Sequence, residues 1–219
     1  EISCSLVGSE MCIRDSYAME QRSDFEKLIR ERRVDYHFQP IVSAHDGHVV
    51  AYEALMRPQL PTLRSPLTVM QLASEMGRLY DIEKLTFFRA CECYEELEAA
   101  GKLDADALIF VNSIASVSLS DEDWASYCEA HSAILPKLVV EITEEEEMNE
   151  RELERKRNVP GSSGVFALDD YGSGYSNGNS LLTIAPKYVK VDIAIIRGID
   201  ADPDKQQFLK ALIEYARPR

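Results

Sequence analysis

Hydrophobic and polar positions along the chain divide it into two alternating kinds of segment. Short apolar runs, typical of buried strands, are followed by longer amphipathic stretches, typical of helices. The apolar runs predict strands over the following ranges: 36–43, 48–56, 108–114, 137–143, 164–170 and 187–196. Asp46-Gly47, a tight-turn dipeptide, separates the first two runs and predicts an antiparallel hairpin.

Helix-start and helix-stop residues mark the stretches between these strands. Ser23 to Glu26 has a capping-box pattern, Ser65-Pro66 combines a cap with proline at the first helical position, and Gly101 predicts a helix end. The predicted helices cover 23–33, a stretch from Ser65, 80–100, a stretch from Ser120, 144–157, a short segment after residue 170 and about 203–216.

The first residues of the chain do not fit this alternation. Residues 1–16 show neither periodicity nor the basic start and apolar centre of a signal peptide. We therefore expect residues 1–22 to be a linker remnant or an artefactual, unstructured segment. Residues 23–219 are expected to form one domain.

The order of the predicted elements indicates the fold class. After the hairpin, strands and helices alternate, and the core strands are continuous apolar runs, as buried parallel strands are. This order is typical of an α/β protein, either a doubly wound sheet or a (β/α) barrel. The glycines after residue 170 do not match the dinucleotide-binding spacing, and the sequence has no phosphate-binding P-loop motif. The missing motifs favour the barrel.

Polar side chains stand at the carboxyl ends of the predicted strands. They are Glu53, Asn112, Glu141, Asp169, Asp170, Lys190 and Asp192. In a barrel these ends converge on the face where barrel enzymes keep their active sites. Carboxylate and amide oxygens suit Mg²⁺, Mn²⁺ or Ca²⁺ rather than zinc. Adjacent aspartates can serve two ions about 4 Å apart, an arrangement used to hydrolyse phosphate esters.

The charge and cysteine content narrow the expected partners and location. The formal net charge of −14 argues against DNA or another nucleic acid bound by a basic face. A small phosphate ligand stays compatible, because a bound dication inverts the local electrostatics. The five cysteines have no zinc-site spacing, and no stretch is long enough for a membrane segment. We therefore expect a cytoplasmic protein with reduced cysteines.

Several short motifs together resemble one protein family. Tyr52 to Arg57, YEALMR, looks like the signature of EAL domains, which are bacterial phosphodiesterases of cyclic di-GMP. Five further motifs follow the family pattern: FQPI (38–41), VNS (111–113), EITE (141–144), DDYGSGYS (169–176) and KVD (190–192). The resemblance covers about residues 24–216. It implies a modified, TIM-like (β/α)8 barrel whose first strand is antiparallel, which fits the predicted hairpin.

The resemblance also implies roles for single residues. Two Mg²⁺ or Mn²⁺ ions would be held by Glu53, Asn112, Glu141, Asp169 and Asp170. Lys190 would lie beside the attacking water and act in catalysis together with Glu53. Cyclic di-GMP would be held by Gln39, Leu55, Arg57 and Asp192, with Arg57 on a phosphate. Glu144 would stabilise the loop after the aspartate pair. The implied reaction is hydrolysis to the linear dinucleotide pGpG.

The sequence departs from the family pattern at one point. The family continues with a strand that ends in Ala-Glu-Gly, a motif this sequence does not contain. We therefore expect a barrel without its last two strand–helix units, and an active parent protein of which this chain alone is inactive. An inactive EAL domain that acts as a cyclic di-GMP sensor or a protein-interaction module is the alternative. A homodimer and an upstream sensory or GGDEF domain also remain open.

Overall fold

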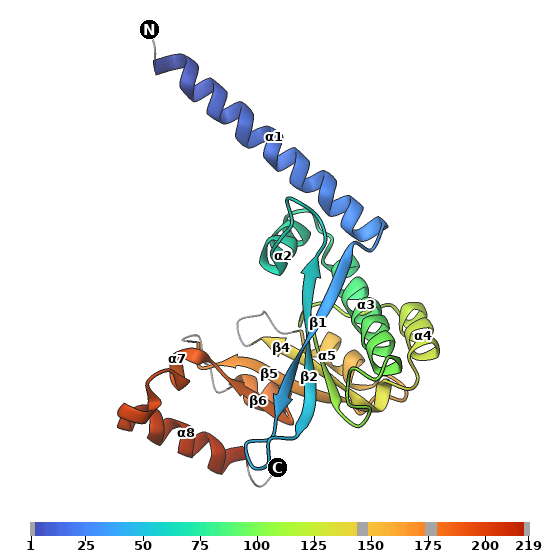
Figure 1. Cartoon of the computed structure of the whole chain (residues 1–219), viewed down its shortest axis with the longest axis vertical. Helices are drawn as coiled ribbons and strands as arrows, with labels where there is room; N and C mark the ends of the chain where they lie inside the picture. The colour runs from blue at the N-terminus through green and yellow to red at the C-terminus, as the bar shows by residue number, and fades with distance from the viewer. Residues whose placement is uncertain (1–2, 144–148, 174–178, 217–219) are drawn as a thin grey trace.

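The strands form a single sheet in a computed structural model that describes residues 3–143, 149–173 and 179–216 (Figure 1). The strands are β1 Val34–Val42, β2 Val49–Pro58, β3 Leu108–Asn112, β4 Leu138–Thr143, β5 Val165–Tyr171 and β6 Tyr188–Val191. They are ordered β1 to β6 across the sheet, with β1 antiparallel to β2 and every other pair parallel. This order confirms the predicted α/β fold and its antiparallel first strand. Within the described residues the barrel is not closed, and β1 and β6 are the sheet edges.

Helices flank this sheet and begin largely where the capping residues predict. The helices are α1 Ser3–Arg30, α2 Pro66–Glu75, α3 Leu79–Ala99, α4 Asp121–Ala130, α5 Glu150–Arg157, α6 Asn179–Ile184, α7 Ile193–Ile196 and α8 Pro203–Ala216. Ser65 caps α2 by accepting from the Leu67 N–H, and Ser120 caps α4 by accepting from the Asp123 N–H. None of the helices in the described ranges is long and apolar enough to span a membrane.

Three predicted boundaries are wrong. The first helix begins at Ser3 rather than at Ser23, and Figure 1 shows α1 leading away from the rest of the chain. The strand predicted over 187–196 stops at Val191, because Asp192 caps α7 by accepting from the Ala194 N–H at 2.7 Å. The helix predicted from residue 144 begins at Glu150, and residues 144–148 lie outside the described part. The division of the chain at residue 22 stays a prediction.

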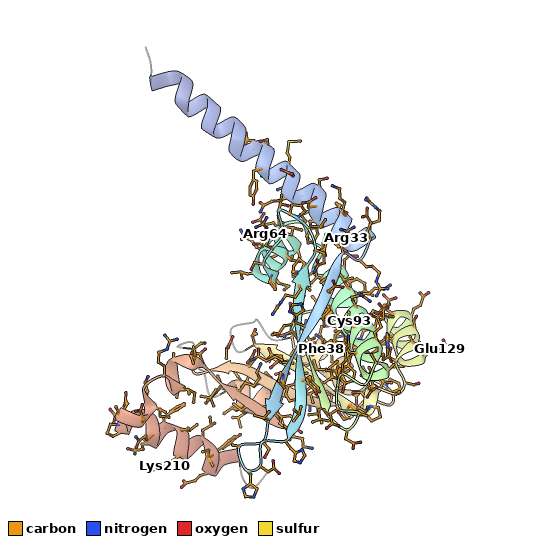
Figure 2. The ribbon with its side chains drawn as sticks, viewed as in Figure 1. Arg33, Phe38, Arg64, Cys93, Glu129 and Lys210 are labelled. Carbon is orange, nitrogen blue, oxygen red and sulfur yellow. The ribbon has the colours of Figure 1, made fainter. Side chains whose placement is uncertain are left out.

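The main hydrophobic core lies between the sheet and the helices that cover its outer face. Buried strand residues such as Ala54, Val111 and Ile142 pack there with apolar residues of α3 and α4. Phe38, labelled in Figure 2, extends from β1 to α3, where its ring meets the ring of Tyr94 edge to face at 5.5 Å. This layer fixes α3 against the sheet.

A second, smaller apolar cluster fills the inner face of the sheet. Its fully buried members are Ala51, Phe110, Val139 and Ala167. Tyr188 packs on them, and its ring meets the Phe110 ring edge to face at 5.2 Å. This cluster forms an apolar floor beneath the carboxyl ends of the strands.

Candidate metal centre

The inner apolar cluster determines which side chains meet above it. Successive side chains of a strand point to opposite faces, so residues two apart share a face. A predicted site residue stands two positions beyond each of the four buried residues of the cluster and beyond Tyr188. These site residues are Glu53, Asn112, Glu141, Asp169 and Lys190. In the ladders Asn112 lies directly opposite Glu141. Glu53 lies opposite Phe110 and Glu141 opposite Ala167, so Asn112 and Asp169 each stand two residues further along their strands than the preceding member.

Three carboxylates converge on one point above this floor. Glu53, Glu141 and Asp169 each offer one oxygen, and these oxygens lie within 4.8 Å of one another. Lys190 Nζ lies among them, 3.1 Å from Glu53 Oε2, 2.5 Å from Glu141 Oε1 and 3.0 Å from Asp169 Oδ1. One ammonium group cannot neutralise three carboxylates, so the group keeps an excess of negative charge.

Glu141 is the least solvated member of this group. Its side chain is 0% exposed, and neither carboxylate oxygen accepts an aligned hydrogen bond from the described part of the chain. Burial raises the pKa of Glu141 to about 7, although the Lys190 charge opposes that rise. A buried carboxylate is costly unless a cation compensates it, and Lys190, which contacts this one, is shared with Glu53 and Asp169. The remaining negative charge and the all-oxygen donor set therefore fit a hard cation.

Lys190 keeps its charge in this environment. Burial lowers the pKa of its ammonium group, but the carboxylates of Glu141, Asp169 and Glu53 raise it further, and the net direction is upward. The side chain is still partly accessible to solvent. Lys190 therefore provides a permanent positive charge at the edge of the three carboxylates.

A cavity of about 330 Å³ opens beside the carboxylates. Its wall includes four of the predicted site residues, namely Glu53, Leu55, Arg57 and Asn112. Arg57 is half-buried, and its Nη1 donates to the Met56 carbonyl at 2.9 Å. Apolar residues of α2 and α3, such as Met70 and Ile82, complete the wall. The cavity is thus lined by the cationic side chain of Arg57, the carboxylate of Glu53 and an apolar surface.

The remaining predicted site residues take different positions. Gln39 is exposed and lies opposite Glu53 in the β1–β2 ladder, on the same face of the sheet. One carboxylate oxygen of Asp192 serves as the cap of α7. Asp170 follows Asp169 at a β-bulge, with an exposed side chain and a φ of 53°, and among the described residues it is not part of the three-carboxylate group. Glu144 lies outside the described residues.

Sequence reasoning missed three polar residues beside the cavity. Glu83 and Ser113 line its wall, and both form hydrogen bonds with Lys156 of α5. The available signal was a glutamate on the apolar face of α3, next to Ile82 and three positions before Thr86. Lys156 gave no such signal, because it lies in a helix made almost entirely of charged residues.

Comparison with known proteins finds relatives over most of the chain. The protein named cyclic di-GMP phosphodiesterase NbdA, from Pseudomonas aeruginosa, is 27% identical over 217 residues, which cover 95% of this chain. The chain spans only 27% of the length of that relative.

Solved structures with the same fold were also found. The PaMucR phosphodiesterase in its c-di-GMP complex is 24% identical with a TM-score of 0.73, covering 91% of this chain and 83% of that one. The manganese/cy-diGMP complex of Klebsiella pneumoniae BlrP1 at pH 9.0 is 22% identical with a TM-score of 0.69, covering 85% of this chain and 47% of that one. These likenesses confirm the predicted TIM-like fold.

A family match completes the assignment. The sequence profile described as the EAL domain matches residues 22–219. The matched range includes all six strands and all the site residues predicted from the sequence. The chain belongs to the EAL domain family.

Proposed function

We propose that the chain carries the ion-binding and phosphate-binding part of a metal-dependent phosphodiesterase that hydrolyses cyclic di-GMP to pGpG. The observation that carries this proposal is the convergence of Glu53, Glu141 and Asp169 beside a cavity at the carboxyl end of the sheet. The similarity to the cyclic di-GMP phosphodiesterase NbdA and to the PaMucR c-di-GMP complex supports the choice of cyclic di-GMP.

The donor set fits Mg²⁺ or Mn²⁺, since it consists of oxygens and includes a buried carboxylate whose Lys190 partner is shared with two further carboxylates. The proposed ligands are those named from the sequence: Glu53, Asn112, Glu141, Asp169 and Asp170. When bound, two such ions supply charge neutralisation at a phosphate and lower the pKa of a water. The manganese complex of BlrP1 supports this choice of ion.

The side chains of the chain itself have separate tasks in this proposal. Lys190 holds a positive charge beside the carboxylates, where it stabilises negative charge that develops on the phosphate during attack. The planar guanidinium of Arg57 offers paired donors to phosphate oxygens from the cavity wall. The apolar wall near Met70 excludes water and suits the face of a nucleobase.

The proposed reaction adds one water molecule across one P–O ester bond. The hydroxyl group goes to phosphorus, the proton goes to the departing ribose oxygen, and no electron transfer occurs. Opening one of the two phosphodiester links of the ring gives a linear dinucleotide with one terminal phosphate. Gln39, Leu55 and Asp192 are proposed to help hold the nucleotide during this step.

A second candidate function is binding of cyclic di-GMP without cleavage. The position of Asp170 favours it, because this carboxylate is exposed at a bulge and separate from the three that converge. A sensor or interaction module needs the cavity but not a complete pair of ions. A homodimer, an attached sensory or GGDEF domain and a cytoplasmic location also stay predictions.

The test is to incubate the full-length parent protein with cyclic di-GMP and Mn²⁺ and to separate the products by chromatography. Binding of cyclic di-GMP is measured in parallel by calorimetry. We expect pGpG in the presence of Mn²⁺, loss of product with EDTA, and recovery when Mn²⁺ is restored. Binding without product would favour the sensor, and absence of both binding and product would overturn the proposal.

A further inference from the structure

A buried ion pair joins the cavity wall to α5. Lys156 of α5 and Glu83 of α3 have side chains 0% and 1% exposed, and Lys156 Nζ lies 2.7 Å from Glu83 Oε1. Lys156 Nζ also donates to Ser113 Oγ and to the Ile114 carbonyl, each at 2.6 Å. These three contacts account for all three ammonium protons.

The carboxylate of Glu83 is bound to the same short segment. Its Oε2 accepts from the Ile114 N–H at 2.9 Å, and its Oε1 accepts from the Ser113 hydroxyl at 2.6 Å. The pair therefore holds both backbone polar groups of Ile114 and the only polar atom of the Ser113 side chain. Four of its hydrogen bonds go to two consecutive residues, which makes it a clamp on residues 113 and 114.

This clamp lies next to the candidate metal centre. Ser113 directly follows Asn112, and its backbone N–H donates to the Glu141 carbonyl at 2.9 Å. Asn112, Ser113, Ile114 and Glu83 all line the cavity. A change in the path of residues 113 and 114 would move Asn112 and disturb the hydrogen bond that joins the ends of β3 and β4.

We propose that the Glu83–Lys156 pair is a positioning device that sets Asn112 and the adjoining cavity wall for ion and substrate binding. The inference rests on the proposed function, which makes Asn112 a ligand. A role in stability alone explains the arrangement less well, because a buried ion pair is often no more stabilising than an apolar pair of similar size. Outer partners that orient metal ligands, in contrast, commonly change metal affinity or activity about 10–100-fold when they are removed.

The test compares variants of the intact protein. Lys156→Met alone leaves the Glu83 carboxylate buried and unpaired, and is expected to lower the melting temperature sharply. The double variant Glu83→Gln with Lys156→Met removes both charges, while the glutamine oxygen can still accept from Ile114. Arg155→Met is the matched control, because Arg155 lies on the same helix and pairs with Asp121, whose side chain is 97% exposed.

The main readout is Mn²⁺ affinity by calorimetry without nucleotide, followed by kcat and KM for cyclic di-GMP. For the folded double variant we expect Mn²⁺ affinity and kcat each about 10–100-fold lower, whereas Arg155→Met stays at the wild-type values. In an Asn112→Ala background the double variant should cause little further loss, because the clamp acts through Asn112. The inference would be overturned if the double variant bound Mn²⁺ as tightly as wild type. It would also be overturned if the double variant lowered Mn²⁺ affinity as much in the Asn112→Ala background as in the wild-type background.

If the double variant does not fold, a further variant still tests the inference. Ser113→Ala keeps both charges and removes only the hydroxyl that joins the pair to residue 113, so Mn²⁺ affinity should fall severalfold. Unchanged affinity in Ser113→Ala would then overturn the inference. A wild-type protein that binds Mn²⁺ but does not cleave cyclic di-GMP would overturn the proposed function only. A wild-type protein that binds no Mn²⁺ would overturn both.

Discussion

Lys190 and Glu141 form the closest ion pair of the candidate site, with Nζ 2.5 Å from Oε1. They come from β6 and β4, which are separated by β5, so the contact crosses the inner face of the sheet. The pair leaves the charges of Glu53 and Asp169 only partly balanced. The candidate site therefore keeps an excess of negative charge beside the cavity.

Removal of metal should lower the stability of the protein. An ion that binds the native carboxylates but not the unfolded chain stabilises by about 2.7 kcal/mol at a hundredfold excess over its Kd. We expect Mn²⁺ to raise the melting temperature of the EDTA-treated protein, and Glu53→Gln to reduce that increase. An equal increase in Glu53→Gln and wild type would place the ion elsewhere.

Loss of single carboxylates should abolish turnover while the fold is retained. Glu53→Ala and Asp169→Ala each remove one of the converging oxygens, so kcat for cyclic di-GMP should fall at least about 10²–10³-fold, the typical cost of one electrostatic contact to a transition state. Circular dichroism should show native secondary structure. Glu75→Ala, at an exposed position of α2, is the control. Wild-type turnover in either site variant would contradict the assignment.

The stability of the metal-free protein should respond to pH through Glu141. Burial raises the pKa of Glu141 from 4.5 to about 7 in the native state, so the folded chain holds one more proton than the unfolded chain between these values. The contribution of Glu141 to the free energy of unfolding therefore falls as pH rises from 4.5 to about 7.

Glu141→Gln removes this titration. In EDTA, the difference obtained by subtracting the wild-type melting temperature from that of Glu141→Gln should thus be larger at pH 8 than at pH 5. A difference between variant and wild type that does not change with pH would show that Glu141 is ionised throughout.

Arg57 should act through donor geometry as well as charge. Arg57→Lys keeps the positive charge in the cavity wall but loses the planar fork that fits phosphate. We expect KM for cyclic di-GMP to rise about tenfold, which corresponds to about 1.4 kcal/mol, with a smaller change in kcat. Arg64→Lys, at an exposed position outside the cavity, should leave both constants unchanged. Equal kinetics for Arg57→Lys and wild type would exclude a bidentate contact.

An added side chain at Gly172 should destabilise the fold. Its φ is 97°, and an added Cβ would lie 2.0 Å from Ile195 Cδ1, so Gly172→Ala combines backbone strain with a clash against α7. Gly77 has a φ of 65° and, among the described residues, no atom within 4 Å of an added Cβ, so Gly77→Ala carries only a left-handed backbone cost of about 1–2 kcal/mol. Chemical denaturation should show the larger loss for Gly172→Ala, partly recovered by Ile195→Ala. Equal losses at the two glycines would contradict the close contact.

Much of the site could be predicted from the sequence, because strand ends carry a strong local signal. Polar residues that interrupt or end the apolar runs, at Glu53, Asn112, Glu141 and Asp169, mark the face of the sheet where their side chains meet, although Glu53 lies within β2 rather than at its end. Parallel pairing then brings together residues far apart in the chain. The roles assigned to these residues, however, came from resemblance to a family and stay predictions.

The features that sequence reasoning missed depend on contacts between distant segments or on competing local signals. Asp192 is followed by the apolar run IAII, which indicates a strand as readily as a capped helix turn. The bulge at Asp170 cannot be distinguished from a regular strand by alternation alone. Glu83 and Lys156 are 73 residues apart in the chain and lie on different helices, so only the tertiary packing of α3 and α5 brings them together.

The inner apolar floor also has an evolutionary consequence. Each residue of the floor precedes its polar partner by two positions, so a one-residue insertion or deletion between them would rotate the polar side chain into the helix layer. Changes in the length of the connecting loops do not alter this spacing. Natural variation among related sequences should therefore tolerate length changes between the strands and exclude them within the last three residues of β3 and at the corresponding positions of β2, β4 and β5.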